Sequence, residues 1–203
     1  MAHDLRSEFG DIDIYLFDQL LRGRIVRGQR VLDAGCGGGR NLIYLLRNGF
    51  DVRAADRDPA AVAHVVMMAR ELAPHLPPDR FRVEPIEGMT FPEGSADVVI
   101  ASAVLHFATS QPHFDAMLAS LWHVLAPGGL LFARLATSIG IADRVRPLGD
   151  GRYLLPDDSE RFLADERMLM DATARLGGRL LDPLKTTIVQ DQRAMTTWVV
   201  GKK

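Results

Sequence analysis

The sequence predicts an α/β fold, in which a mostly parallel sheet carries helices on both faces, and two neighbouring segments indicate it. The first is Val31–Asn41, V-L-D-A-G-C-G-G-G-R-N, where an apolar run suited to a buried parallel strand leads through a glycine-dense turn into a helix-like segment, Asn41–Leu46. The second is Asp51–Asp58, where a strand-like run ends at Asp56, about twenty residues after Gly35. This spacing is typical of a βαβ nucleotide-binding unit.

The glycine-dense turn has the composition of a ligand-binding loop. Gly35, Gly37 and Gly39 form a G-x-G-x-G series. Because glycine has no Cβ, it adopts positive φ at little cost and lets a ligand lie against the main chain. Ordinary strand-to-helix turns also collect glycine, so the series alone is open to a purely structural interpretation. Asp56 favours the binding interpretation, because an acid at the end of the second strand binds ribose hydroxyls.

The residues around the glycines discriminate between cofactors. In the dinucleotide pattern G-x-G-x-x-G the third glycine allows close packing of helix on strand, and Arg40 stands at that position here. Asp33, two residues before Gly35, would repel a pyrophosphate and attract a cationic amino group. An NAD-dependent oxidoreductase is therefore the weaker alternative.

With D-A-G-C-G-G-G followed by Asp56, the chain resembles the class I S-adenosylmethionine-dependent methyltransferases. Within them it resembles the small-molecule and tellurite-resistance-like members, which carry G-R-N after the glycines. The resemblance implies a Rossmann-like doubly wound sheet, mostly parallel with an antiparallel last strand, in a single domain over residues 1–203. It also implies S-adenosyl-L-methionine as the cofactor, S-adenosyl-L-homocysteine as the product and a small-molecule methyl acceptor. A non-catalytic module that only binds S-adenosylmethionine is the alternative.

The resemblance further implies a set of cofactor contacts. The Gly35–Gly39 backbone would receive the methionine and ribose end, Asp33 would orient the amino group, and Asp56 would accept both ribose hydroxyls. The other expected contacts are Arg40 and Asn41 at the carboxylate, Glu87, Gly88 and Met89 around the adenine, Ser102, Ala103 and His106 beside the sulfonium, and Cys36 and Arg57 elsewhere along the cofactor. Tyr15 would touch the cofactor's methionine end or the acceptor, and the alternative for Tyr15 is an aromatic residue on the buried face of its helix. For Cys36, a small residue packed in the loop is favoured over a reactive thiol.

Candidates for catalysis and acceptor binding follow later in the chain. His106 could act as a general base, because imidazole titrates near neutrality, or it could only shape the pocket wall. The irregular stretch 137–158 is a candidate acceptor loop. From it Arg152 and Tyr153, with Arg134 from the preceding strand, would meet an anionic or aromatic acceptor; the alternative for these residues is solvated surface.

Hydrophobic periodicity and turn residues predict the remaining elements. They are a helix over Asp13–Val26 within an N-terminal helical lid (1–28), helices over Ala60–Leu72, Gln111–Leu125 and Ser159–Leu176, and strands over Phe81–Ile86, Ala96–Ala101, Leu125–Leu135, Arg179–Gln190 and Ala194–Lys202.

Composition bounds the function classes. The chain has 203 residues, of which 47% are apolar, and this suits one substantial core. Its net charge of −2, with both signs mixed along the chain, argues against a nucleic-acid or membrane partner. The chain has one cysteine, no apolar segment typical of a signal peptide and no apolar run long enough to span a bilayer. These features favour a cytoplasmic enzyme, which we expect to be a monomer or homodimer. The six histidines show no i, i+4 pair, so no metal site is expected.

Overall fold

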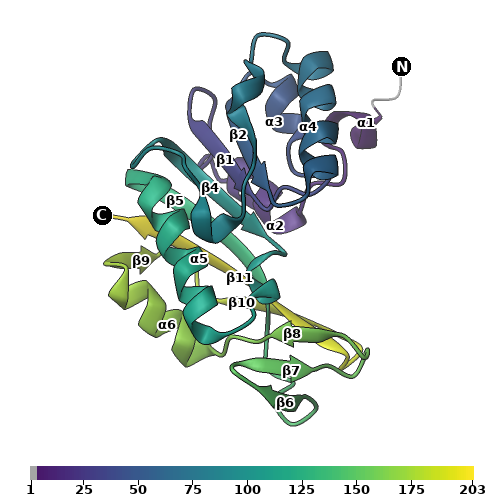
Figure 1. Cartoon of the computed structure of the whole chain (residues 1–203), viewed down its shortest axis with the longest axis vertical. Helices are drawn as coiled ribbons and strands as arrows, with labels where there is room; N and C mark the ends of the chain where they lie inside the picture. The colour runs from purple at the N-terminus through teal and green to yellow at the C-terminus, as the bar shows by residue number, and fades with distance from the viewer. Residues whose placement is uncertain (1–3) are drawn as a thin grey trace.

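The computed structural model describes residues 4–203, so the first three residues of the predicted domain and lid lie outside the described part of the chain. At its centre is an eight-stranded sheet in the order β10-β11-β5-β4-β1-β2-β3, with β9 paired to β11 (Figure 1). Its strands are β1 Arg30–Ala34, β2 Asp51–Asp56, β3 Phe81–Val83, β4 Ala96–Ser102, β5 Leu125–Thr137, β9 Gly178–Leu180, β10 Lys185–Val189 and β11 Arg193–Lys202. Strands β1 to β5 run parallel and β11 runs antiparallel to β5, which confirms the predicted fold class.

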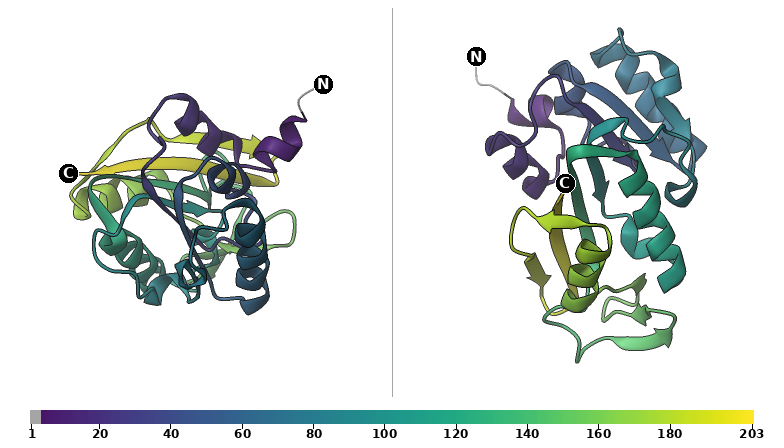
Figure 2. Two further views of the ribbon diagram at one scale, coloured as in Figure 1. Left: turned by 90° about the horizontal axis from the view of Figure 1, so that it is seen from above. Right: turned by 90° about the vertical axis from the view of Figure 1, so that its left-hand side faces the viewer.

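Helices cover both faces of this sheet (Figure 2). They are α1 Leu5–Phe9, α2 Ile14–Leu21, α3 Ile43–Arg47, α4 Pro59–Leu72, α5 Gln111–Val124 and α6 Glu166–Arg175, with single 3₁₀ turns η1 Pro78–Arg80, η2 Ile86–Gly88 and η3 Leu105–Phe107. Val98 and Ile100 of β4 pack with α2, α3 and α4, whereas Val99 and Ala101 pack with α5 and α6. Because successive strand residues point to opposite faces, the near-continuous apolar run of β4 serves both cores.

The region after β5 differs from its prediction. The stretch 137–158 is not irregular throughout, since β6 Arg146–Gly149 and β7 Arg152–Leu154 pair with β8 Glu160–Phe162 in a separate three-stranded sheet. The predicted helix over Ser159–Leu176 is therefore wrong at its start. Helix α6 begins only after Asp165, whose carboxylate accepts the Met168 N–H at 2.7 Å. The predicted strand over Arg179–Gln190 is likewise split into β9 and β10.

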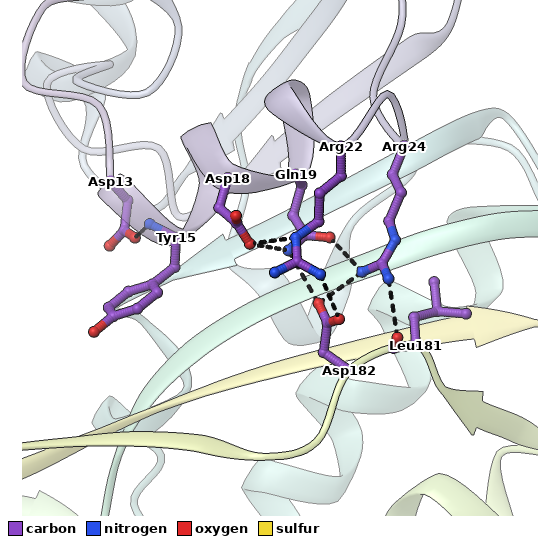
Figure 3. Close-up of polar contacts among 8 residues, drawn as sticks. All are labelled: Asp13, Tyr15, Asp18, Gln19, Arg22, Arg24, Leu181 and Asp182. Atoms are coloured by element: carbon purple, nitrogen blue, oxygen red, sulfur yellow. Dashed lines mark hydrogen bonds and ion pairs between the residues drawn. The ribbon is translucent and has the colours of Figure 1, made fainter.

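Helix α2 is fastened to the C-terminal part of the chain by Asp182, which lies between β9 and β10. The Asp182 carboxylate accepts hydrogen bonds from Gln19 at 3.1 Å, Arg24 at 2.6 Å and Arg22 at 3.3 Å (Figure 3). Burial alone would raise the pKa of Asp182, but the hydrogen bonds from Arg24 and Gln19 hold the pKa below its ordinary value. These bonds hold the C-terminal end of α2, and at the start of the helix Asp13 acts as the cap by accepting the Tyr15 N–H at 3.0 Å.

Candidate active site

A cavity of about 630 Å³ lies beyond the carboxyl ends of β1, β2 and β4. This position is where open α/β sheets bind ligands, and the volume suits a small organic molecule. The predicted cofactor residues on its wall are Gly35, Cys36, Gly37, Arg40, Asn41, Asp56, Arg57, Glu87, Ser102 and Ala103. Gly38 of the expected Gly35–Gly39 backbone and Val104, between the expected Ala103 and His106, also line the cavity. The lining residues that the sequence did not single out are Asp58, Pro85, Ile86, Phe107, His113 and Met117.

The turn after β1 needs glycine for two different reasons. At Gly35, where φ is +73°, an added Cβ would lie 2.4 Å from Cγ2 of Val104, so the approach of the β4 connection excludes a side chain. At Gly37, where φ is +50°, no heavy atom lies within 4 Å of the added Cβ. The side of Gly37 without a side chain is therefore open, and its backbone is accessible to a ligand in the cavity.

Asp56 forms part of the same wall and organises the loop. One carboxylate oxygen accepts the Gly37 N–H at 2.8 Å and the other accepts the Asp58 N–H at 2.9 Å. An ionised carboxylate has about four acceptor sites, so Asp56 can hold the loop and still accept hydroxyl hydrogens from a ligand.

Asp33 lies at the carboxyl end of β1 with 1% of its surface exposed. Neither carboxylate oxygen has a hydrogen-bond partner among the described residues. Burial raises the pKa of Asp33 to about 7, although the nearby Arg40 guanidinium opposes the shift. Asp33 is not among the residues that line the cavity. A buried carboxylate without a hydrogen-bond partner, next to the loop, is nevertheless suited to pair with a cationic group of a ligand.

Cys36 is the residue between the first two glycines of the loop. Burial, with the charges of Asp33 and Asp56, raises the pKa of its thiol. A thiol held protonated is a poor nucleophile, so the geometry favours the packed-residue interpretation of Cys36.

The R-N pair after the glycines links the loop to two other elements. Arg40 Nη2 lies 3.0 Å from the Ser102 hydroxyl at the end of β4 and 3.4 Å from Oδ2 of Asp13. Asn41 Oδ1 accepts the Asp13 backbone N–H at 3.0 Å. Arg40 and Asn41 therefore join the cavity wall to the residue that caps α2.

At the far end of the cavity, Glu87 is the polar residue predicted near the adenine. Its Oε1 lies 3.3 Å from Nε2 of His113 and 3.6 Å from the Arg57 guanidinium. Burial alone would raise the pKa of Glu87, but a backbone hydrogen bond and His113 bring the pKa below its ordinary value. Gly88 and Met89, also predicted there, lie outside the set of lining residues.

His106 faces the interior and lies outside the lining set. It is 6% exposed, and its Nδ1 accepts the Ala136 N–H at 3.2 Å. Burial, aided by the Arg161 charge, lowers the pKa of His106 to about 4. At neutral pH the ring is an uncharged acceptor for the β5 backbone.

Tyr15 and the three predicted acceptor residues also lie outside the lining set. The hydroxyls of Tyr15 and Thr187 of β10 share a hydrogen bond of 2.6 Å, and Arg134 donates to Asp13 at 3.0 Å. Arg152 pairs with Glu160 inside the small sheet, and Tyr153 packs on the cluster that includes Leu155.

Instead, the small sheet reaches the cavity through a residue that the sequence did not indicate. Phe107, on the cavity wall, is 55% exposed, and the Arg161 guanidinium of β8 lies 5.0 Å from the centroid of its ring. An aromatic residue in the short segment after β4, which ends at Ser102, was a visible signal for Phe107. No sequence signal pairs it with Arg161, because that contact depends on β8 pairing with β7.

The loop, the two acids and the strand-end position of the cavity agree with the family to which the sequence aligns. A family model described as a methyltransferase domain matches residues 32–133, from β1 through most of β5. The chain belongs to this methyltransferase domain family. The predicted methyltransferase family is confirmed at this level.

Curated relatives place the methyltransferase domain inside longer proteins. This chain is 31% identical over 103 residues to an uncharacterized methyltransferase from a Synechocystis species, and the match covers 51% of this chain and 45% of the relative. It is 29% identical over 154 residues to mouse EEF1A lysine methyltransferase 4, covering 70% and 58% of the two chains. The chain thus spans about half the length of these relatives.

Solved structures share the fold of the methyltransferase domain at low sequence identity. A methyltransferase from Methanosarcina mazei has a TM-score of 0.70 at 17% identity, covering 90% of this chain and 96% of that chain. The 1,6-didemethyltoxoflavin-N1-methyltransferase of Burkholderia thailandensis, solved with S-adenosylhomocysteine, has a TM-score of 0.71 at 19% identity, covering 98% and 81%. The [4+2]-cyclase SpnF has a TM-score of 0.73 at 16% identity, covering 93% and 80%. The cyclase shows that this fold alone does not specify methyl transfer.

Residues 4–203 contain neither a candidate metal site nor a candidate membrane-spanning helix. No group of three or more His, Cys, Asp or Glu side chains is arranged to hold a metal ion, and no helix has both the length and the apolarity to span a bilayer.

Proposed function

We propose that this methyltransferase domain transfers the methyl group of S-adenosylmethionine to a small-molecule acceptor by in-line displacement. The observation that carries the proposal is Asp33, a buried carboxylate with no hydrogen-bond partner in the described chain, next to a loop whose other acid, Asp56, faces the cavity. A ligand with an amino cation at one end and a ribose at the other satisfies both acids. S-adenosylmethionine has both groups, whereas a pyridine dinucleotide would bring a pyrophosphate toward Asp33.

The chain's own residues would then bind and orient S-adenosylmethionine. Asp33 would hold the amino group, Asp56 the ribose hydroxyls, and Arg40 the carboxylate, for which it would exchange part of its contact with Ser102. Glu87 and His113 would lie at the adenine end. The G-R-N segment on which the resemblance to tellurite-resistance-like members rests contributes through Arg40 and Asn41, and that narrower placement remains a prediction.

Positioning is the main catalytic task in this proposal. Bound S-adenosylmethionine supplies an electrophilic methyl group: the acceptor's lone pair forms a bond to the methyl carbon while the carbon–sulfur bond breaks and its electrons return to sulfur. Holding two reactants in line provides effective molarities of order 10⁵ M or more, so no protein nucleophile is required. We do not assign His106 as the base, because the pKa of its buried ring is lowered to about 4 and its Nδ1 is engaged by Ala136.

Two measurements test the proposal. Calorimetric titration should show saturable S-adenosylhomocysteine binding and a much weaker response to NAD. Incubation with S-adenosylmethionine tritiated on the methyl group should then label a metabolite extract. Preference for NAD would contradict the cofactor assignment, and binding without labelling of any fraction would favour the module that binds without transfer. Label appearing in protein instead would replace the small-molecule acceptor with a protein one, the class named for the mouse relative.

A further inference from the structure

A row of four polar side chains crosses neighbouring strands beside the cavity. Ser102 on β4 is in register with Arg134 on β5. Arg134 is in register with Thr197 on β11, and Thr197 with Lys185 on β10. Residues in register on adjacent strands point to the same face of a sheet. We call these four residues the cationic row; it begins at Ser102, which is part of the cavity wall.

Positive charge exceeds negative charge along this row. The Asp13 carboxylate, whose side chain is fully buried, is shared by Arg134 at 3.0 Å and Arg40 at 3.4 Å through the same oxygen. In the described part of the chain Lys185 has no carboxylate partner. Its ammonium lies 5.6 Å from the Tyr15 ring centroid, and the Arg134 guanidinium lies 5.3 Å from the same centroid. Arg40 and Arg134 thus share one carboxylate, and Lys185 has no carboxylate partner among the described residues, which leaves positive charge for a second anion.

Two buried polar atoms of the row lack partners. Arg134 Nε and Thr197 Oγ1 make no hydrogen bond within residues 4–203, and Thr197 is 5% exposed. Buried donors are normally satisfied, and an unsatisfied guanidinium N–H beside an unsatisfied hydroxyl is the donor pair that a carboxylate accepts from. The unpartnered atoms are an observation independent of the charge excess, and both indicate an anionic ligand.

We propose that the cationic row binds a carboxylate of the methyl acceptor, so that the substrate is a small carboxylic acid. The inference rests on the proposed function, because it places the acceptor next to the cofactor's reactive end at Ser102. Arg134 and Thr197 donate hydrogen bonds to the carboxylate, and Lys185 adds a second charge. The Tyr15 ring, held by its 2.6 Å bond to Thr187, and the exposed ring of Phe107 offer apolar surface for the rest of the molecule.

One other anion could occupy the row, namely the carboxylate of the cofactor's own methionine end. The two possibilities predict different effects of a substitution in the cationic row on the affinities for the acceptor and for S-adenosylhomocysteine. If the row holds the acceptor, removing Lys185 weakens acceptor binding and leaves S-adenosylhomocysteine affinity intact. If the row holds the cofactor, S-adenosylhomocysteine affinity falls instead.

Benzoate, with benzamide as its neutral counterpart of similar shape, serves as the probe. Each is titrated into the full chain saturated with S-adenosylhomocysteine and followed by protein NMR. We expect saturable benzoate binding, at least about tenfold weaker benzamide binding, and a loss of about tenfold or more in benzoate affinity in Lys185→Gln and in Thr197→Val. Lys203→Gln, at the residue after the end of β11, is the charge-matched control and should bind benzoate as the unchanged chain does.

The possible outcomes separate the two proposals. Failure of S-adenosylhomocysteine itself to bind contradicts the proposed function. With S-adenosylhomocysteine bound, equal affinities for benzoate and benzamide, no saturable benzoate binding, or unchanged benzoate affinity in both variants overturns the inference. A loss of S-adenosylhomocysteine affinity in Lys185→Gln overturns it too, because it assigns the row to the cofactor. Normal folding of each variant is checked by its thermal unfolding midpoint.

Discussion

The carboxylate of Asp56 accepts the backbone N–H of Gly37 at 2.8 Å, which joins the end of β2 to the middle of the glycine loop after β1. The glycine loop and the acid at the end of β2 are therefore one unit, in which Asp56 holds the conformation of the loop. The second Asp56 oxygen holds the Asp58 N–H at the start of α4. A substitution at Asp56 thus acts on the ligand contacts and on the loop, and these effects need separate variants.

Two substitutions of Asp56 should weaken cofactor binding to different extents. Asp56→Asn keeps one acceptor oxygen for Gly37 but loses the charge that strengthens bonds to ribose hydroxyls, which costs about 1.5–3 kcal/mol of binding free energy. Asp56→Ala removes the loop contact as well and should lose most of the affinity. Calorimetric titration with S-adenosylhomocysteine measures both, with Glu71→Gln on the exposed face of α4 as the charge-matched control. Equal affinity in all three variants would show that Asp56 binds no ligand.

Asp33 should make the stability of the free protein depend on pH. Burial raises the pKa of Asp33 to about 7 from its ordinary value of 3.8. Between those pH values the folded protein retains a proton that the unfolded chain has lost, so the free energy of unfolding falls as pH rises from about 4 to about 7. Urea unfolding across this range should show the fall in the unchanged chain and a smaller fall in Asp33→Asn. Parallel curves for the two proteins would contradict a raised pKa.

The same carboxyl group should couple cofactor binding to proton release. A cationic amino group favours the ionised form of Asp33, so affinity should rise as pH increases toward about 7. Calorimetric titration with S-adenosylhomocysteine at about pH 6, in two buffers of different ionisation enthalpy, measures the protons released. We expect the release to disappear in Asp33→Asn, and an unchanged release there would assign the proton to another group.

Gly35→Ala and Gly37→Ala should separate packing from ligand access. Both require positive φ, at a cost of about 1–2 kcal/mol for a residue with a side chain. Gly35→Ala additionally places Cβ 2.4 Å from Val104, so its thermal unfolding midpoint should fall further than that of Gly37→Ala. Val104→Ala combined with Gly35→Ala should recover part of the loss. The absence of any recovery would show that the Val104 contact is not the cause.

His106 should influence stability at acidic pH. Its pKa is lowered to about 4 from an ordinary 6.5, chiefly by burial. The stability that comes from keeping this ring neutral is complete above about pH 6.5 and is lost as pH falls toward about 4. His106→Asn keeps an acceptor for the Ala136 N–H, so its unfolding free energy should fall less steeply over this range, as urea titrations would show. A pH–rate profile of methyl transfer that loses its acidic limb in His106→Asn would instead establish His106 as the base.

The local sequence pattern was sufficient to predict the unit that runs from β1 to Asp56. Each signal there is contained in a short segment: a buried strand, glycines where φ is positive, and an acid at the next strand end. Pattern was insufficient after β5, where the segment Glu160–Phe162 forms a strand only because β7 supplies its hydrogen bonds. The contact of Phe107 with Arg161 could not be predicted from local pattern either. The sequence shows Phe107 as an aromatic residue, but the Arg161 guanidinium reaches its ring only because β8 pairs with β7.

By itself, the sequence determined the fold class and the position of the glycine loop and its two acids, because spacing along about twenty-five residues sets what a βαβ unit can place at its strand ends. Tertiary structure alone decided which distant residues meet there. The Asp13 cap of α2 reaches Arg40 and Arg134, and Arg134 is 121 residues away from it in the sequence. Lys185 comes into register with Thr197, and Thr197 with Arg134, because β11 runs antiparallel between β10 and β5. Which residues meet across the sheet depends on strand order and register, which local propensity does not encode.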